Sequence, residues 1–238
     1  MQYIADCQAM PFGNTHVMPS CGKLLECFAG SRSVGSIADG LGMEVFSIDI
    51  KNFEGINLVA DMEFVTVKDI PFVPDVAWFS PPCTTYSIAA ISHHRKGHLP
   101  VSEFAKKSDR LLNNTVKLIN DLSLINPDMK FFIENPVGMM RKMPIMKQFD
   151  RATVTYCKYG DTRMKPTDIW TNHLAGLFNQ KGWRPLPMCF NGNRKCHHEA
   201  APRGSKTGTQ GLKNDYERSK IPIALCLEIL TSTMSKVA

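Results

Sequence analysis

The chain has 238 residues, 43% of them hydrophobic, and a formal net charge of +6. This length and apolar content suit one globular domain with a small insertion. The mild basicity is compatible with a polyanionic partner, although many ordinary enzymes share it. No apolar run approaches the ~18 residues of a membrane span, and the first residues lack the pattern of a signal peptide. We therefore expect a cytosol-like compartment, in which the eight cysteines are reduced thiols, and we also expect a monomer.

Apolar runs alternate with helical patterns through the first part of the chain. Their periodicity predicts strands and intervening helices. The strands are expected at 23–28, 44–49, 56–60, 75–79 and 130–134, and the helices at 32–42, 103–124 and 217–231. Strands that alternate with helices predict an α/β fold with a mostly parallel sheet and helices on both faces.

The composition changes after Trp170, where Gly, Pro, Asn, Lys and Arg become frequent. Between residues 181 and 220, nine Lys or Arg residues stand against three acids, an excess of +6 that equals the net charge of the whole chain. The surplus positive charge is therefore concentrated in one segment, which favours a nucleic-acid partner.

A glycine-containing turn lies between the first predicted strand and helix, in the run ECFAGSRSVG at 26–35. Glycine lets the backbone pass close to a ligand, and the start of a helix exposes N–H groups. Asp49 ends the next strand, where a carboxylate can accept ribose hydroxyls. The alternative interpretation is an ordinary strand-to-helix turn.

Two further strands end in residues suited to chemistry. Pro81-Pro82-Cys83 follows the strand at 75–79, and the two prolines hold the thiol in a rigid backbone. Glu134-Asn135-Pro136 ends the strand at 130–134 and places a carboxylate at the same sheet edge. A buried core cysteine and a helix-capping acid are the alternatives.

These pieces together resemble the DNA (cytosine-5) methyltransferase family. The resemblance covers residues 24–172 and a weaker piece at 217–230, and it rests on the ordered motifs ECFAGSRSVG, SIDI, DM, DVAWFSPPCTTYS, FFIENPVG and CKYGDTRMKPTDIWTN. The short recognition region is similar to that of phage and prophage members. The family implies a Rossmann-like class I methyltransferase fold with S-adenosylmethionine as cofactor.

The resemblance also implies roles for individual residues. Cys83 matches the nucleophile, and Glu134 and Asn135 match the family's Glu-Asn pair. The family's Gln-x-Arg-x-Arg is replaced by Arg163-Met164-Lys165-Pro166-Thr167, so Arg163 or Lys165 is expected to contact the base. The implied cofactor-binding residues are Phe28, Ala29, Gly30, Ser31, Ser33, Val34, Asp49, Ile50, Asp61, Met62, Ser80 and Pro81.

The family acts on double-stranded DNA, whose target base must be flipped out of the stack. The resemblance thus divides the chain into a catalytic domain at 1–172, a basic target-recognition segment at 173–216 and a C-terminal helix at 217–238. The basic loop at 84–100 and the segment at 203–211 are expected to touch DNA, with a solvated charge run or a flexible loop as alternatives. The predicted contacts are Ser87, His93, His94, Arg95, Lys96, Arg203, Ser205, Lys206, Thr207 and Gln210.

The basic segment also carries residue types that bind metals, in the run Cys189-x6-Cys196-His197-His198. Structural zinc sites take four Cys or His ligands. Cys189, Cys196 and His197 would hold zinc with Cys157 or water as the fourth ligand. The cysteine spacing is wider than in common zinc motifs, and ordinary surface residues are the alternative interpretation.

Three other functions stay open at this point. The same chemistry could act on RNA such as transfer RNA, which the short recognition region fits. A non-catalytic nucleic-acid-binding protein would keep the fold alone, although the intact Cys83 and Glu134 argue against it. A methyltransferase for small molecules is disfavoured by the basic segment.

Overall fold

The computed structural model describes residues 22–176, 181–199 and 214–234. Its main sheet contains β1 (Lys23–Cys27), β2 (Glu44–Asp49), β3 (Leu58–Val59), β4 (Val76–Phe79), β7 (Lys130–Pro136), β8 (Arg151–Thr155) and β9 (Pro166–Thr171). The helices are α2 (Gly35–Gly40), α3 (Ile91–His94), α4 (Glu103–Ile125), α5 (Asp215–Ser219) and α6 (Ile223–Met234). A small hairpin joins β5 (Arg95–Lys96) to β6 (Leu99–Pro100), and short 3-10 turns include η2 (Thr84–Tyr86) and η5 (Tyr156–Tyr159).

The strand order in the main sheet is β3-β2-β1-β4-β7-β9-β8. The first five strands in this order run parallel, whereas β9 is antiparallel to both of its neighbours. The chain proceeds outward from β1 in one direction and then returns to place β4 on the other side. The strand order therefore reverses between β1 and β4, and open α/β sheets bind their ligands at the carboxyl ends of such strands.

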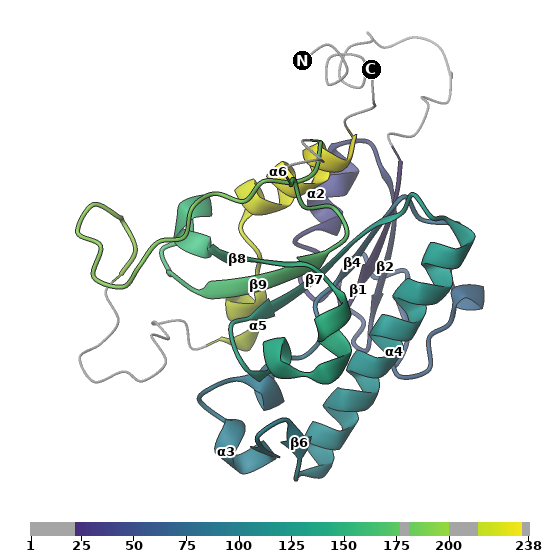
Figure 1. Cartoon of the computed structure of the whole chain (residues 1–238). Coiled ribbons are helices and arrows are strands. Elements are labelled where there is room, and N and C mark those ends of the chain that lie inside the picture. The colour runs from purple at the N-terminus through teal and green to yellow at the C-terminus, as the bar shows by residue number, and fades with distance from the viewer. Residues whose placement is uncertain (1–21, 177–180, 200–213, 235–238) are drawn as a thin grey trace, which may run out of the picture.

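Helices cover both faces of the sheet (Figure 1). On one face, α4 buries an apolar stripe that includes Leu112, Val116 and Ile119 against the strands. On the other face, α2 and α6 pack beside each other through residues such as Ala38 and Leu225. The predicted Rossmann-like α/β fold, a mostly parallel sheet with helices on both faces, is therefore confirmed.

Local sequence explains where α4 begins. The Ser102 side chain accepts a hydrogen bond from the Ala105 N–H, and Glu103 places negative charge in the first turn. At the other end, the Asn126 side chain donates to the Pro74 carbonyl, which ties the end of α4 to the loop before β4. Within the described ranges, no helix combines the length and apolarity needed to span a membrane.

Several predicted boundaries differ from the structure. The helix expected at 32–42 is shorter, because the chain first forms a tight turn in which Arg32 has a φ of 51°. The helix expected at 217–231 is replaced by α5 and α6, because Pro222 separates them. The loop expected at 84–100 contains η2, α3 and the β5–β6 hairpin, whose turn is made by Gly97 with a φ of 61°.

Candidate active site

The Cys83 thiol lies just beyond the end of β4. Ser80 continues the strand ladder by donating its N–H to the Cys27 carbonyl, and its hydroxyl accepts from the Trp78 indole. Pro81 and Pro82 then end the strand, and Cys83 occupies the position before η2, where its carbonyl accepts from the Tyr86 N–H. Cys83 is therefore half-buried at the carboxyl edge of the sheet on a backbone that has little freedom.

Residues at the end of β7 hold the loop of Cys83 through a hydrogen bond and through close packing. Phe79 pairs with Ile133, so Glu134 and Asn135 continue alongside the residues that lead to Cys83. The buried Asn135 amide donates to the Pro81 carbonyl over 2.8 Å, and no described residue donates to its Oδ1 atom. A side chain on Gly138 would overlap the Tyr86 carbonyl oxygen, so glycine permits the close approach of the two loops.

Glu134 is buried and engaged by residues that follow β8. The Tyr156 hydroxyl donates to Glu134 Oε1 over 2.8 Å. Lys165 Nζ lies 4.5 Å from the centre of the Tyr156 ring and donates to the Arg218 carbonyl over 3.1 Å. Lys165 has a φ of 28°, a conformation that L-residues rarely adopt. The surrounding structure thus holds the lysine over the tyrosine and near the carboxylate.

Strand pairing places Glu134 beside the loop that carries Cys83, and Tyr156 links Glu134 to Lys165. Burial raises the pKa of the Cys83 thiol, and Glu134 raises it further, whereas Lys165 acts to lower it. Burial lowers the pKa of Lys165, and Glu134 and Cys83 oppose that change. The thiol is consequently protonated at neutral pH, and it needs positive charge nearby to become a nucleophile.

The reactivity of Cys83 tests this electrostatic balance. Because Lys165 lowers the pKa of the thiol, Lys165→Met should slow alkylation of Cys83 by iodoacetamide several-fold at a fixed pH, and Lys165→Arg should preserve most of the rate. In the native chain the rate should rise about tenfold per pH unit up to the thiol pKa. Quantitative peptide mass spectrometry of Cys83 measures both effects, and equal rates in all three proteins would contradict the assignment.

The turn after β1 lies at the same sheet edge. Phe28 and Gly30 have φ values of 58° and 50°, so the backbone turns sharply there. The Asp49 carboxylate at the end of β2 accepts the N–H groups of Gly30 and Lys51, both over 2.9 Å. A carboxylate has about four acceptor positions, so Asp49 retains capacity for hydroxyl groups of a ligand. The exposed Ile50 side chain provides an apolar surface next to it.

Other predicted cofactor residues are already bonded within the protein. Asp61 forms an ion pair with Lys107 over 2.7 Å, which lowers its pKa. The buried Met62 accepts from Asn114 through its carbonyl. The hydroxyls of Ser31 and Ser33 are 2.8 Å apart, and Ala29 is buried.

Val34 requires a correction. Its side chain is fully buried in the core and its N–H donates to Glu26, so it supports the turn and does not present a surface to a ligand. Burial raises the pKa of that glutamate to about 7, although it also accepts from Ser47. Glu26 was not predicted as a site residue, because only the folded structure shows that it orders the turn.

Arg163 also differs from the prediction. Its guanidinium forms an ion pair with Asp161 over 2.5 Å and donates to the Arg218 carbonyl, so it is buried in a structural network. Of the two basic residues expected to contact the base, Lys165 lies over Tyr156, the hydrogen-bond partner of Glu134, whereas the Arg163 guanidinium is held by Asp161.

The charged loop at 84–100 contains both exposed and buried residues. His93 and Lys96 are exposed, as a phosphate contact requires, and Ser87 is half-buried. The Arg95 side chain is instead fully buried: it pairs with Asp109 over 2.5 Å and lies over the Tyr86 ring at 4.2 Å. The prediction that Arg95 contacts phosphate is corrected, because the guanidinium holds the loop onto α4. His94 is half-buried and lies 2.8 Å from the Ser102 hydroxyl.

Arg95 and Lys96 therefore form a matched pair of adjacent cations with different roles. Arg95→Met should destabilise the protein by about 3 kcal/mol, because it leaves Asp109 partly buried without its partner. Lys96→Met should leave stability unchanged and weaken nucleic-acid binding, with a shallower salt dependence. Chemical denaturation and binding titrations at several salt concentrations measure the two effects, and the reverse pattern would contradict the assignment.

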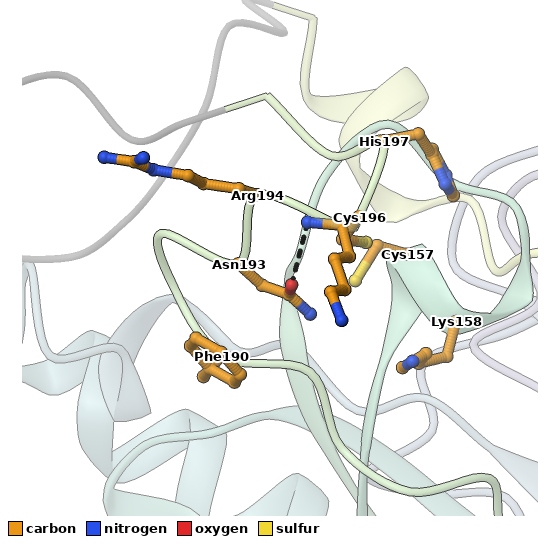
Figure 2. Close-up of a pocket in the computed structure, with 8 residues that line it drawn as sticks. Cys157, Lys158, Phe190, Asn193, Arg194, Cys196 and His197 are labelled. Carbon is orange, nitrogen blue, oxygen red and sulfur yellow. Dashed lines mark hydrogen bonds between the residues drawn. The ribbon is translucent and has the colours of Figure 1, made fainter.

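The predicted metal ligands are only partly brought together. Cys189 and Cys196 lie with Cys157, as the alternative with a fourth protein ligand requires. His197 lies apart from the sulfur atoms of Cys157 and Cys196 (Figure 2), and its Nε2 atom is 3.0 Å from the Asp161 carbonyl oxygen. The histidine in the cluster is His198, which corrects the prediction. Adjacent side chains leave the backbone in different directions, so the sequence alone could not choose between them.

The second group of predicted nucleic-acid contacts lies outside the described residues. It comprises Arg203, Ser205, Lys206, Thr207 and Gln210. Among the described residues, sequence reasoning missed Tyr156, which is the hydrogen-bond partner of Glu134. Its position next to the family-like run CKYGDTRMKP was the only available signal.

Comparisons with known proteins give structural similarity alone. No protein-family model matches the chain, and no curated protein matches it significantly. Among solved structures, the Entamoeba histolytica methyltransferase EhMeth is 17% identical to this chain with a TM-score of 0.49. The alignment covers 66% of this chain and 54% of the EhMeth chain. The S. pombe Dnmt2 methyltransferase is 12% identical with a TM-score of 0.43, and the alignment covers 63% of this chain and 49% of the Dnmt2 chain. A mutant of Spodoptera frugiperda DNMT2 is 15% identical with a TM-score of 0.46, covering 69% and 54%. The chain thus spans about half the length of each of these proteins.

Proposed function

We propose that this chain transfers a methyl group from S-adenosylmethionine to carbon 5 of cytosine in DNA. The observation that carries the proposal is that Glu134 ends β7 beside the loop of Cys83 and that its partner Tyr156 lies under the Lys165 ammonium. A nucleophile, a proton-carrying group and a cation are what addition to an aromatic pyrimidine requires.

The nucleophilic step belongs to Cys83. Its sulfur attacks carbon 6 of the cytosine ring, which breaks the aromaticity and makes carbon 5 nucleophilic. Charge then develops on the ring. Glu134 is proposed to carry a proton at ring nitrogen 3, and Lys165 to donate to the ring carbonyl. Removal of the carbon-5 proton by a base allows the carbon–sulfur bond to break, which releases Cys83.

Tyr156 and Asn135 are proposed as positioning residues. Tyr156 donates to one oxygen of Glu134 and leaves the other for the base. Asn135 holds the Pro81 carbonyl, and its buried Oδ1 atom remains an acceptor for a ligand N–H or for water. Both residues thereby fix the distance between the thiol loop and the carboxylate.

The turn at 28–31 and the carboxylate of Asp49 fit the proposed cofactor. Asp49 would accept the ribose hydroxyls, the exposed Ile50 would contact the adenine ring, and Asp61 would accept from its amino group. When bound, S-adenosylmethionine supplies an electrophilic methyl group. Ser80 and Pro81 directly follow β4 and would line the site between the cofactor and Cys83.

The basic segment at 173–216 is proposed to recognise DNA, since it holds seven Lys or Arg residues against two acids. Bisulfite sequencing of cells that express the chain tests the substrate. The proposal predicts new methylated cytosines in DNA with the native chain and none with Cys83→Ser. New methylation confined to transfer RNA would instead make RNA the substrate, and no methylation in either would contradict the proposal.

A further inference from the structure

Three cysteines and one histidine converge where the basic segment meets η5. The ligand atoms of Cys157, Cys189, Cys196 and His198 all lie within 4.8 Å of one another. Cys157 belongs to η5 in the main body of the chain, whereas the other three belong to the loop at 189–198. The cluster therefore joins two segments that are distant in sequence.

The spacing matches a tetrahedral metal site. With zinc–sulfur bonds of about 2.3 Å and zinc–nitrogen bonds of about 2.0 Å, neighbouring ligand atoms lie roughly 3.6–3.8 Å apart. The Sγ atom of Cys189 and the Nδ1 atom of His198 are 3.7 Å apart. The remaining separations, at no more than 4.8 Å, close onto one ion through small side-chain rotations.

The surroundings support bound metal rather than a chance cluster of surface residues. Cys157, Cys189 and His198 are buried and Cys196 is half-buried. The three ligands from the loop at 189–198 are covered in this way although their neighbours in the loop are polar and exposed. The Cys189 N–H donates to the Thr155 hydroxyl over 2.8 Å, which fixes the first loop ligand against the sheet. The Asn193 amide donates to the Cys189 sulfur over 3.4 Å. Such hydrogen bonds to thiolate ligands are typical of the second shell of metal sites.

We propose that Cys157, Cys189, Cys196 and His198 bind one structural zinc ion. Three thiolates and an imidazole are a soft donor set that favours zinc over magnesium or calcium. Four protein ligands leave no open coordination position, so the ion has a structural role and no role in catalysis.

The zinc site fastens the basic loop to the proposed active site. Arg194 and Lys195 lie between two of the ligands and are exposed. In Figure 2 both the Arg194 side chain and the sulfur atoms of Cys157 and Cys196 can be followed, with the arginine extending outward. The ligand Cys157 directly follows Tyr156, the partner of Glu134. Metal binding thus orders the positive charges at a fixed position relative to that carboxylate.

Metal analysis of the purified full chain tests the site directly. The native chain, expressed with zinc in the medium, should contain about one zinc ion per molecule by mass spectrometry of the elements. Cys196→Ser and His198→Ala should lose most of it. His197→Ala is the matched control, because this adjacent histidine lies outside the cluster, and it should keep the full content.

A second measurement distinguishes loss of a metal ligand from misfolding of the variant. His198→Cys restores four ligands, so it should bind metal, and cobalt in the native site should give the intense visible absorption of a tetrahedral thiolate complex. Native protein that takes up neither zinc nor cobalt would overturn the proposal. So would equal zinc loss in His197→Ala and His198→Ala, or a disulfide between two of the three cysteines in protein purified without reductant.

The zinc site and the proposed methyl transfer can fail separately. Cys83→Ser should keep full zinc content while it loses methyl transfer. Zinc binding without any methylation would support the metal site and contradict the catalytic proposal, whereas methylation by native protein that takes up no zinc would do the reverse.

Discussion

Cys83→Ser is expected to lower the rate of methyl transfer by a factor on the order of 10³ or more. A hydroxyl is a far weaker nucleophile than a thiol, because its pKa is much higher and little of it is ionised at neutral pH. The rate is measured as transfer of radiolabelled methyl groups to DNA under single-turnover conditions.

The accompanying control is cofactor binding. The residues proposed to hold S-adenosylmethionine lie on the turn after β1 and at the ends of β2 and β3, so the Cys83→Ser variant should bind it with unchanged affinity in calorimetry. Transfer at the native rate by this variant would exclude Cys83 as the nucleophile. Loss of both transfer and cofactor binding would instead point to misfolding of the β4 loop.

Glu134→Gln is expected to change two properties in opposite directions. Methyl transfer should fall by about 10²–10⁴-fold, because an amide cannot carry the proton to the ring. Alkylation of Cys83 should become faster, because the Glu134 carboxylate raises the pKa of the thiol and its removal lowers that pKa. Below the thiol pKa, a lower pKa means a larger thiolate fraction at the same pH.

Glu44→Gln is the matched control for this prediction. Glu44 is exposed at the amino end of β2, where it pairs with Lys23, so both rates should stay at their native values. If Glu134→Gln lowered transfer and alkylation together, the carboxylate would be acting through the structure of the loop and not through its charge.

The central parallel strands were predictable because they are buried on both faces. Such strands appear in sequence as continuous apolar runs, and all four residues of β4 (Val76–Phe79) are buried and lie within the strand predicted at 75–79. In contrast, β8 and β9 were missed. The centre of β9 contains Asp168, a fully buried acid that pairs with Arg141 over 2.6 Å and accepts from Thr153. That pairing makes a polar segment stable inside the sheet, and it exists only in the folded state.

The residues of the candidate site differ in the same way: some could be predicted from local sequence, whereas others depend on partners that only the fold brings near. Cys83 and Glu134 could be predicted together, because parallel strands bring their carboxyl ends to one edge. The roles of Tyr156, Arg95 and His198 depend on partners far away in sequence: Glu134, Asp109 and Cys157 respectively. Residue type gave the correct chemistry for the metal ligands, but only the direction of the side chains separates His198 from His197.

The covalent bond between Cys83 and the cytosine ring is the central claim, and trapping it is the most direct measurement. Fluorine at carbon 5 cannot leave as a proton does, so a cytosine with this substitution should hold the enzyme after methyl transfer. Incubation with S-adenosylmethionine and DNA containing 5-fluorocytosine should give a complex that survives denaturation, with the cross-link on the peptide that contains Cys83. A methylated product formed with no adduct at Cys83, or an adduct on another residue, would contradict the mechanism.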